Sequence, residues 1–280
     1  MTQKIYPTFI YGTAWKEERT ESLVILALEN GFKAIDTANQ RKHYDEIAVG
    51  KALKLYLEKM EVSREDLFVQ TKFTHISGQD NRIPYDAHSD IPTQVEQSFN
   101  SSLDHLNTKY IDSYILHGPL TRIGLSQKDW QAWKKMEEIY GSGKTKAIGI
   151  SNVNIAQLEE LCTHANIPPA FVQNRCYASQ RWDSEIRVFC QKNGIYYQGF
   201  SLLTANTKFF ENPVLSDIAQ KYECSIKQII FRFFQNIGAI PLTGTTNPQH
   251  MSEDLNIGKF QLSPQEVASI ERISSNVEKY

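Results

Sequence analysis

Eight short strand-like runs alternate with helical segments along the chain, and this alternation constrains the fold more than any other feature. Alternating units of this kind predict a parallel sheet whose strands are connected by helices. The strand-like runs are Phe9–Gly12, Lys33–Asp36, Phe68–Lys72, Ile111–His117, Lys146–Ile150, Ala170–Gln173, Ile195–Phe200 and Ala239–Leu242. Helical periodicity covers Glu18–Glu29, Glu46–Met60, Thr93–Leu106, Gln127–Tyr140, Ile155–Ala165, Ser184–Lys192, Val214–Lys221 and Ile226–Phe234, and further helices are expected after Pro248 and Pro264.

The number of units favours a closed barrel over an open sheet. Several runs are almost wholly apolar, as in "KAIGI", which is typical of strands covered on both faces. Eight such units in 280 residues fit one domain, residues 1–280, folded as a (β/α)8 TIM barrel. A doubly wound open sheet is the alternative, but it usually carries a G-x-G-x-x-G after an early strand, and none is present.

The composition excludes several classes of protein. Lys and Arg number 30 against 32 Asp and Glu, without a basic stripe, so a nucleic-acid partner is not expected. The first thirty residues are rich in charge and lack a long apolar run, which argues against a signal peptide or membrane anchor and favours a cytoplasmic protein. The four cysteines lie far apart, so we expect small buried thiols and no metal site. We also expect a monomer.

One connection is unusually long. Residues 73–91 show no periodicity and contain two turn signals, Gly78 and Pro84. Loops of this length in a compact domain are usually functional or disordered. Because a loop after the third strand begins where barrel enzymes carry their chemistry, we expect it to border the substrate. A mobile surface insertion is the alternative.

Polar residues stand where the predicted strands end, at the edge on which barrel active sites are built. Each alone has an ordinary explanation, such as a helix cap or a satisfied core residue. Together they supply an acid, a cation, an imidazole and hydrogen-bonding groups on one rim, which a purely structural barrel does not require. They are Asp36, Lys72, His117, Ser151, Asn152, Gln173 and Asn174.

The chain resembles the aldo-keto reductase family over nearly its whole length. The resemblance rests on the order of "GTA" at 12–14, "IDTA" at 35–38, "VGKAL" at 49–53, "VQTK" at 69–72, "YIDSYILHGP" at 110–119, "AIGISN" at 147–152, "VQNRCY" at 172–177 and "IPLTGTTNP" at 240–248. It implies a barrel that binds a nicotinamide cofactor and uses NADPH to reduce aldehydes or ketones to alcohols. The family's catalytic Asp, Lys and His would be Asp36, Lys72 and His117.

The catalytic tyrosine does not stand at its usual spacing. In most members it follows the aspartate by five residues, where this chain has Arg41. A guanidinium cannot give up a proton near neutral pH. We therefore expect a loop about three residues longer, which brings Tyr44 to the proton-donating position. An inactive protein, in which Tyr44 only packs on the following helix, is the alternative. By the resemblance, Asp36 would keep Lys72 charged, and the Lys72 ammonium would lower the pKa of Tyr44.

The resemblance also implies residues for cofactor and substrate. A carbonyl substrate would lie against Trp15, Tyr85 and His117, in a pocket opened by Gly118 and Thr74, where many members carry tryptophan. Phe200 replaces the tyrosine that stacks on the nicotinamide, and a phenyl ring keeps the face that stacking needs. The cofactor residues implied are Gly12, Thr13, Ser151, Asn152, Gln173, Phe200, Ser201, Leu203, Thr243, Gly244, Thr245, Asn247 and His250.

The nucleotide end departs from the pattern of NADPH users. The lysine and arginine that usually hold the 2′-phosphate are here Leu242 and His250. A histidine is cationic only toward acidic pH. We therefore expect NADPH to be preferred by a smaller margin than usual, with NADH also usable. Two other functions remain open: a nonenzymatic NADP(H)-binding sensor, and a Schiff-base lyase with Lys72 as nucleophile.

Overall fold

Eight parallel strands close into one barrel in their sequence order. The computed structural model describes residues 6–274. Strand β1 pairs with both β2 and β8, which closes the sheet and confirms the predicted barrel. The strands are β1 Ile10–Gly12, β2 Ala34–Asp36, β3 Phe68–Phe73, β4 Ser113–Leu116, β5 Ile148–Ser151, β6 Phe171–Arg175, β7 Tyr196–Phe200 and β8 Ile240–Thr243.

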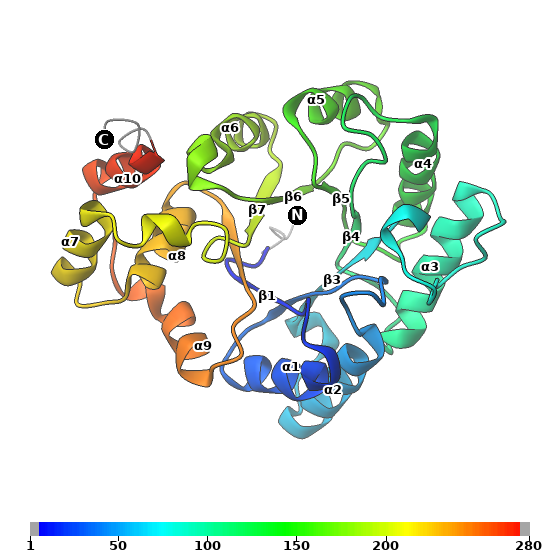
Figure 1. The fold of residues 1–280 in the computed structure, drawn as a ribbon. Helices are drawn as coiled ribbons and strands as arrows, with labels where there is room; N and C mark the ends of the chain where they lie inside the picture. The colour runs from blue at the N-terminus through cyan, green and yellow to red at the C-terminus, as the bar shows by residue number, and fades with distance from the viewer. Residues whose placement is uncertain (1–5, 275–280) are drawn as a thin grey trace.

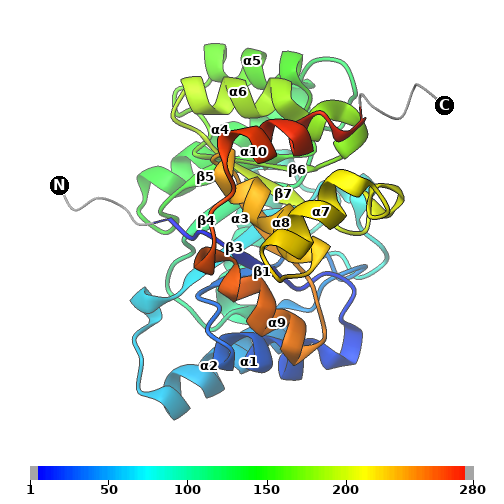
Figure 2. The same ribbon diagram turned by 90° about the vertical axis from the view of Figure 1, so that its left-hand side faces the viewer.

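Helices surround the barrel on all sides (Figures 1 and 2). They are α1 Thr20–Glu29, α2 Glu46–Met60, α3 Ile91–His105, α4 Gln127–Gly141, α5 Ile155–His164, α6 Ser184–Lys192, α7 Pro213–Lys221, α8 Ile226–Asn236, α9 Pro248–Leu255 and α10 Pro264–Glu271. Short 3-10 turns lie at Glu17–Arg19, Arg64–Asp66, Ile76–Gly78, Ala178–Asp183, Thr207–Phe209 and Asn256–Lys259. Two helices, α7 and α8, lie between β7 and β8 in the sequence. The connection between these strands is therefore long enough to extend over the carboxyl ends of the barrel strands.

Helix starts follow the local sequence. Ser126, Asn154, Ser225 and Ser263 each cap a helix through a reciprocal capping box, which satisfies amide groups that a helix start leaves unpaired. The fourth strand is shorter than predicted. Ile111 forms only an isolated bridge to Thr145, and His117 lies just past β4, so its side chain stands on the rim.

Two layers fill the barrel interior. Apolar side chains from six strands or their edges form the lower layer: Ile10, Ala34, Ile115, Ala147, Phe171, Ile240 and Leu242. Three glutamines, Gln70, Gln173 and Gln198, form a hydrogen-bonded layer that reaches across the barrel from β3 and β6 to β7. The catalytic candidates therefore rest on polar groups that are already paired.

Outside the barrel, Trp133, Met136 and Ile139 of α4 are buried and Trp130 is half-buried, which confirms the predicted packing stripe. All four cysteines are free thiols; Cys176 and Cys190 are buried, whereas Cys162 and Cys224 are only half-buried. Among residues 6–274, no helix is long and apolar enough to cross a membrane, and no cluster of three metal-binding side chains occurs.

Candidate active site

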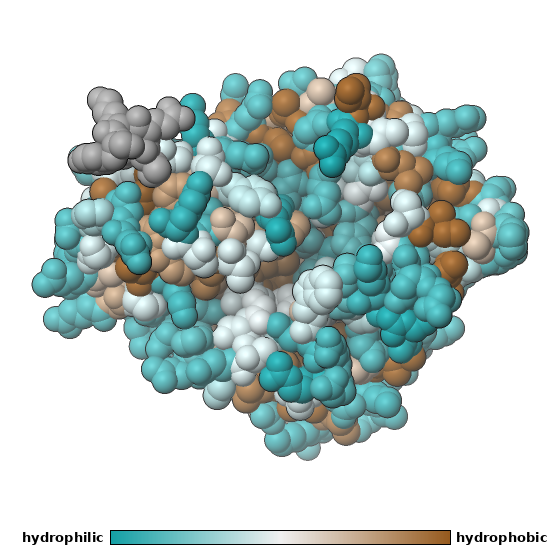
Figure 3. Space-filling model, in the orientation of Figure 1, coloured by the Kyte–Doolittle hydropathy of each residue, from teal (hydrophilic) through white to brown (hydrophobic). Residues whose placement is uncertain are grey.

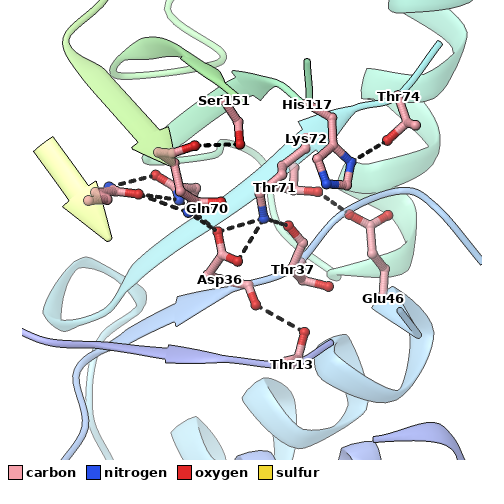
Figure 4. Close-up of polar contacts among 12 residues, drawn as sticks. Thr13, Asp36, Thr37, Glu46, Gln70, Thr71, Lys72, Thr74, His117 and Ser151 are labelled. Atoms are coloured by element: carbon pink, nitrogen blue, oxygen red, sulfur yellow. Dashed lines mark hydrogen bonds and ion pairs between the residues drawn. The ribbon is translucent and has the colours of Figure 1, made fainter. Parts of the chain in front are cut away.

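A buried ion pair lies at the centre of the site, between the ends of β2 and β3 (Figure 4). The ammonium nitrogen of Lys72 lies 2.7 Å from each carboxylate oxygen of Asp36 and 2.7 Å from the carbonyl oxygen of Thr37. Lys72 is fully buried, and burial lowers its pKa while the Asp36 carboxylate opposes that shift. Three oxygen acceptors thus hold the ammonium in one place.

The Asp36 carboxylate is held by further donors. Gln70 donates to its Oδ1 at 2.7 Å and Gln173 at 3.0 Å, and both amides also bond Gln198. The amide and hydroxyl of Thr13 both donate to the Asp36 backbone carbonyl, at 3.0 Å. Gln70 and Gln198 were not singled out from the sequence. Their signal was available, because each is a polar residue at an inward position of a buried strand.

The lengthened segment after β2 brings Tyr44 to this pair. The amides of His43 and Tyr44 both donate to the carbonyl of Gln40, which folds the extra residues into a turn. The Gln40 side chain donates to the Gly78 carbonyl at 2.7 Å. Lys72 Nζ then lies 5.2 Å from the centre of the Tyr44 ring. Tyr44 faces the pocket, whereas Arg41 does not line it.

The environment of Tyr44 differs from the expectation in one respect. Lys72 was expected to lower the pKa of Tyr44. Instead, burial raises the pKa of the Tyr44 hydroxyl above its usual value, and the Asp36 carboxylate adds to the rise. The reason is that burial is the larger effect, and that the Lys72 ammonium is bound to Asp36, whose charge acts on the phenol in the opposite sense. Tyr44 is therefore a neutral phenol throughout the physiological pH range.

His117 completes the cluster from the end of β4. Its ring centre lies 6.0 Å from that of Tyr44, at a steep angle of 69°. Burial lowers the pKa of His117 to about 3, and the charges of Lys72 and His43 add to the shift. The imidazole is therefore neutral near pH 7. Its Nδ1 lies 2.6 Å from the Thr74 hydroxyl, and within the described residues 6–274 its Nε2 has no hydrogen-bond partner.

The cluster opens into one pocket at the carboxyl ends of the strands. Its volume is about 640 Å³, within the range of small-molecule and cofactor sites. Figure 3 shows the molecular surface hollowed near its centre, in the orientation of Figure 1. The pocket reaches from Asp36, Tyr44 and His117 to helices α8 and α9. Aromatic and aliphatic side chains supply much of its wall: Trp15, Phe200, Leu202, Leu203, Phe210, Phe231 and Leu242.

Most of the residues expected at the cofactor do line this pocket. They are Gly12, Ser151, Asn152, Gln173, Phe200, Ser201, Leu203, Thr243, Gly244, Thr245 and His250. Thr13 and Asn247 do not: Thr13 is buried under Asp36, and Asn247 caps the start of α9. Some expected donors are already engaged, since the hydroxyl of Ser151 donates to the Gln173 carbonyl at 2.6 Å.

Of the two aromatic residues expected at the substrate, one lines the pocket and the other does not. Trp15 lines the pocket, is 66% exposed and packs against His43, with ring centres 3.8 Å apart and ring planes tilted by 37°. Tyr85 does not line the pocket, so its expected place in the wall is wrong. Its ring packs on Phe73, and its hydroxyl donates to the Thr74 carbonyl at 2.7 Å.

The long loop also lies elsewhere than expected. It begins at the catalytic rim, but none of residues 73–91, all of which the structure describes, lines the pocket. The loop packs behind the site instead. Gln79 donates to the carbonyl of Asn39 at 3.0 Å and to that of Thr74 at 3.3 Å. It therefore supports the segment that carries Tyr44 and the residue beside His117.

Four charged residues of the pocket were missed from the sequence: Lys16, Arg175, Lys227 and Asp254. Lys16 donates through a short hydrogen bond to the carbonyl of Gly244, and burial lowers its pKa. Burial raises the pKa of Asp254 to about 7. Lys16 lies two residues after the quoted "GTA" and could have been found from that motif. Lys227 and Asp254 lie on helices, where nothing in the sequence marks them as facing the pocket.

Fold and site together define a barrel oxidoreductase: a (β/α)8 domain with a buried acid–lysine pair, a neutral phenol and a neutral imidazole at the mouth of a cofactor-sized pocket. Residues 8–275 match the model of the aldo/keto reductase family. The chain belongs to this family and is an NAD(P)H-dependent oxidoreductase; carbonyl substrates are typical of the family.

Individual relatives agree over almost the whole chain. An uncharacterized oxidoreductase, YtbE, of Bacillus subtilis is 31% identical, and the match covers 97% of this chain and 90% of the relative. The glyoxal reductase of the same organism is 28% identical, with 92% of this chain and 84% of the relative covered. The crystal structure of a Bombyx mori aldo-keto reductase in complex with NADP superposes with a TM-score of 0.81 at 25% identity, covering 98% of this chain and 94% of that one.

Proposed function

We propose that this protein reduces small aldehydes or ketones to alcohols with NADPH, with Tyr44 as the proton donor. The observation that carries the proposal is the convergence of Tyr44, His117 and the Asp36–Lys72 pair at one end of the pocket. The Tyr44 hydroxyl and His117 Nε2 are neutral there, and within residues 6–274 neither has a hydrogen-bond partner. A carbonyl oxygen that gains negative charge needs such donors.

The residues present fit a dinucleotide. Gly12 and Gly244 both line the pocket, and a Cβ built on Gly244 would come within 3.3 Å of Lys16 Nζ. Lys16, Arg175 and Lys227 supply positive charge toward phosphates. Phe200 would stack on the nicotinamide, with Ser151, Asn152 and Gln173 beside its carboxamide. The wall of aromatic and aliphatic side chains would exclude water from the ring.

A bound reduced nicotinamide supplies the hydride when the cofactor is in place. Tyr44 gives its phenolic proton to the carbonyl oxygen as negative charge develops there. The His117 Nε2 hydrogen points to the same oxygen and orients it. Asp36 keeps Lys72 fixed beneath the Tyr44 ring, where the ammonium stabilises the phenolate left after proton transfer. Trp15, which packs against His43, forms part of the outer wall beside which a substrate enters.

The lyase alternative is disfavoured by the position of Lys72. A Schiff base needs a free amine that a substrate carbonyl can reach. Lys72 is fully buried, bonded to three oxygen atoms, and does not line the pocket. Borohydride should therefore trap no carbonyl compound on this lysine.

The test of the function is a screen of aldehydes and ketones that follows the loss of NADPH absorbance, with cofactor binding measured separately by fluorescence. Turnover of a carbonyl compound above that of the Tyr44→Phe variant supports a reductase. Tight NADPH binding without turnover on any carbonyl would favour a nonenzymatic NADP(H) sensor instead. Failure of both binding and turnover would contradict the proposed cofactor site.

The preference for NADPH over NADH should depend on pH. We expect the ratio of the NADH and NADPH dissociation constants to rise roughly three- to tenfold between pH 8 and pH 6, as expected for a charge a few Å away at intermediate dielectric. One group of the pocket changes charge over this interval. Asp254, whose pKa burial raises to about 7, loses its negative charge as pH falls, and the repulsion between that carboxylate and the 2′-phosphate falls with it. His250 lines the same end of the pocket.

Variants test the role of Asp254. Asp254→Asn should flatten the pH dependence, and His250→Gln is the comparison at the neighbouring position of the pocket. His250→Arg should favour NADPH at every pH. Glu253 and Lys227 also act on Asp254: the charge of Glu253 raises the pKa of Asp254, and the charge of Lys227 lowers it. If the ratio of the two dissociation constants depends neither on pH nor on the residues at 250 and 254, the phosphate is held elsewhere, for example by amides of the Gly244 loop.

A further inference from the structure

The hydrogen bond between Thr74 and His117 joins two neighbouring positions on the barrel rim. Thr74 follows β3, and His117 follows β4, whose last residues Phe73 and Leu116 are paired in register. The amide of His117 donates to the carbonyl of Phe73 at 2.9 Å. The backbone thus places the two side chains together, with Thr74 Oγ1 at 2.6 Å from His117 Nδ1 (Figure 4).

The direction of this hydrogen bond decides which nitrogen of His117 carries the proton. A neutral imidazole has one N–H and one acceptor nitrogen. Among residues 6–274, Thr74 Oγ1 has no other hydrogen-bond partner, and Thr74 is buried. If Nδ1 held the proton, the Thr74 hydroxyl hydrogen would have no acceptor, which is unfavourable in a buried site. The hydroxyl therefore donates to Nδ1, and the proton lies on Nε2.

Thr74 itself is fixed by the long loop. Its carbonyl accepts hydrogen bonds from the Tyr85 hydroxyl at 2.7 Å and from the Gln79 amide at 3.3 Å. A Cβ built on Gly78 would come within 2.7 Å of the Thr74 methyl group, so the loop backbone approaches Thr74 closely. A segment that makes no contact with the pocket thereby reaches the chemistry through one side chain.

We propose that Thr74 is a positioning residue that holds His117 in the Nε2–H tautomer and aims that hydrogen into the pocket. Its kinetic part rests on the proposed reduction, in which the Nε2 hydrogen meets the carbonyl oxygen. The tautomer itself does not depend on that function. Thr74, which was expected to open the substrate pocket, does not line it and acts only through His117.

The experiment compares wild type, Thr74→Val and Thr74→Ser. Valine keeps the shape of the side chain and removes the hydroxyl, whereas serine keeps the hydroxyl. Nitrogen-15 NMR of the His117 ring, assigned with a His117→Gln variant, reports the tautomer near pH 7 without substrate or cofactor. We expect Nε2–H in wild type and Thr74→Ser, and a substantial Nδ1–H population in Thr74→Val.

Kinetics with a carbonyl found in the screen provide the second measurement. We expect kcat to fall by about tenfold or more in Thr74→Val. The NADPH dissociation constant should stay within about twofold, and Thr74→Ser should restore most of the turnover. A wild-type protein in the Nδ1–H tautomer would overturn the proposal, and so would a Thr74→Val protein that keeps both Nε2–H and wild-type kcat.

The two measurements distinguish failure of the proposed reductase function from failure of the proposed role of Thr74. If no carbonyl compound is turned over, the NMR comparison still decides whether Thr74 sets the tautomer. If Thr74→Val does not fold, the wild-type spectrum alone decides, because the hydrogen-bond pattern requires Nε2–H there.

Discussion

Replacing Tyr44 with phenylalanine should lower kcat for carbonyl reduction by about 10² to 10⁴-fold, the usual contribution of a positioned general acid. The ring would remain against Lys72 and His117, and only the hydroxyl would be lost. The NADPH dissociation constant should stay close to that of wild type, because the phenol is placed at the substrate end of the pocket. Stopped-flow turnover and fluorescence titration of the cofactor measure the two effects separately.

Arg41 supplies the matched control, because it occupies the position at which the tyrosine usually stands. It does not line the pocket, and its carbonyl accepts a hydrogen bond from Arg82 on the outside of the loop. Arg41→Ala should therefore keep kcat within about tenfold, roughly 1.4 kcal/mol of barrier. Wild-type turnover in Tyr44→Phe would show that another group donates the proton.

The pH profile gives an independent check on the same residue. Burial raises the pKa of Tyr44 above its usual value near 10, so the phenol keeps its proton through the neutral and mildly alkaline range. His117, with a pKa lowered to about 3, is neutral over that range. With cofactor and substrate saturating, kcat for reduction should be flat from about pH 5 to pH 9. A basic limb near pH 7 would mean that a different group controls proton transfer.

The sequence predicted the barrel because its eight apolar runs and intervening periodic segments follow directly from strands buried on both faces. It predicted that Asp36, Lys72 and His117 lie close together, because residues at the carboxyl ends of parallel strands share one rim of the barrel regardless of loop conformation. Tyr44 also lines the pocket, as expected from the resemblance of "VGKAL" to the family's helix, which implied where the longer loop ends. Its proton-donating role is the property that the Tyr44→Phe variant tests.

The errors share a physical cause. The paths of loops depend on hydrogen bonds between segments distant in sequence, and these leave no local pattern. Tyr85 points toward Thr74 rather than the substrate because its hydroxyl finds that carbonyl. Asp254 enters the pocket because one face of α9 is turned inward. The sequence of an eight-residue helix has too few positions to show which face that is. The raised pKa of Tyr44 follows from burial and from the pairing of Lys72, both of which are tertiary properties.

Removing one partner of the buried Asp36–Lys72 pair should lower the free energy of unfolding. Lys72→Met would leave the Asp36 carboxylate buried with only the Gln70 and Gln173 amides as side-chain donors. Removing one member of a buried pair typically costs about 3–5 kcal/mol of unfolding free energy, because an uncompensated charge stays in the interior. Urea unfolding should show this loss in Lys72→Met, together with loss of turnover.

The double variant Asp36→Asn, Lys72→Met separates stability from function. It removes both charges, and an asparagine keeps hydrogen-bonding capacity toward the glutamine layer. We therefore expect it to recover a substantial part of the stability that Lys72→Met loses. Turnover should not recover, because no ammonium remains beneath the Tyr44 ring to stabilise its phenolate. Equal stability of the single and double variants would show that the Asp36 charge is not the source of the penalty. Recovered turnover in the double variant would show that Tyr44 gives up its proton without the pair, and the pair would then serve the fold alone.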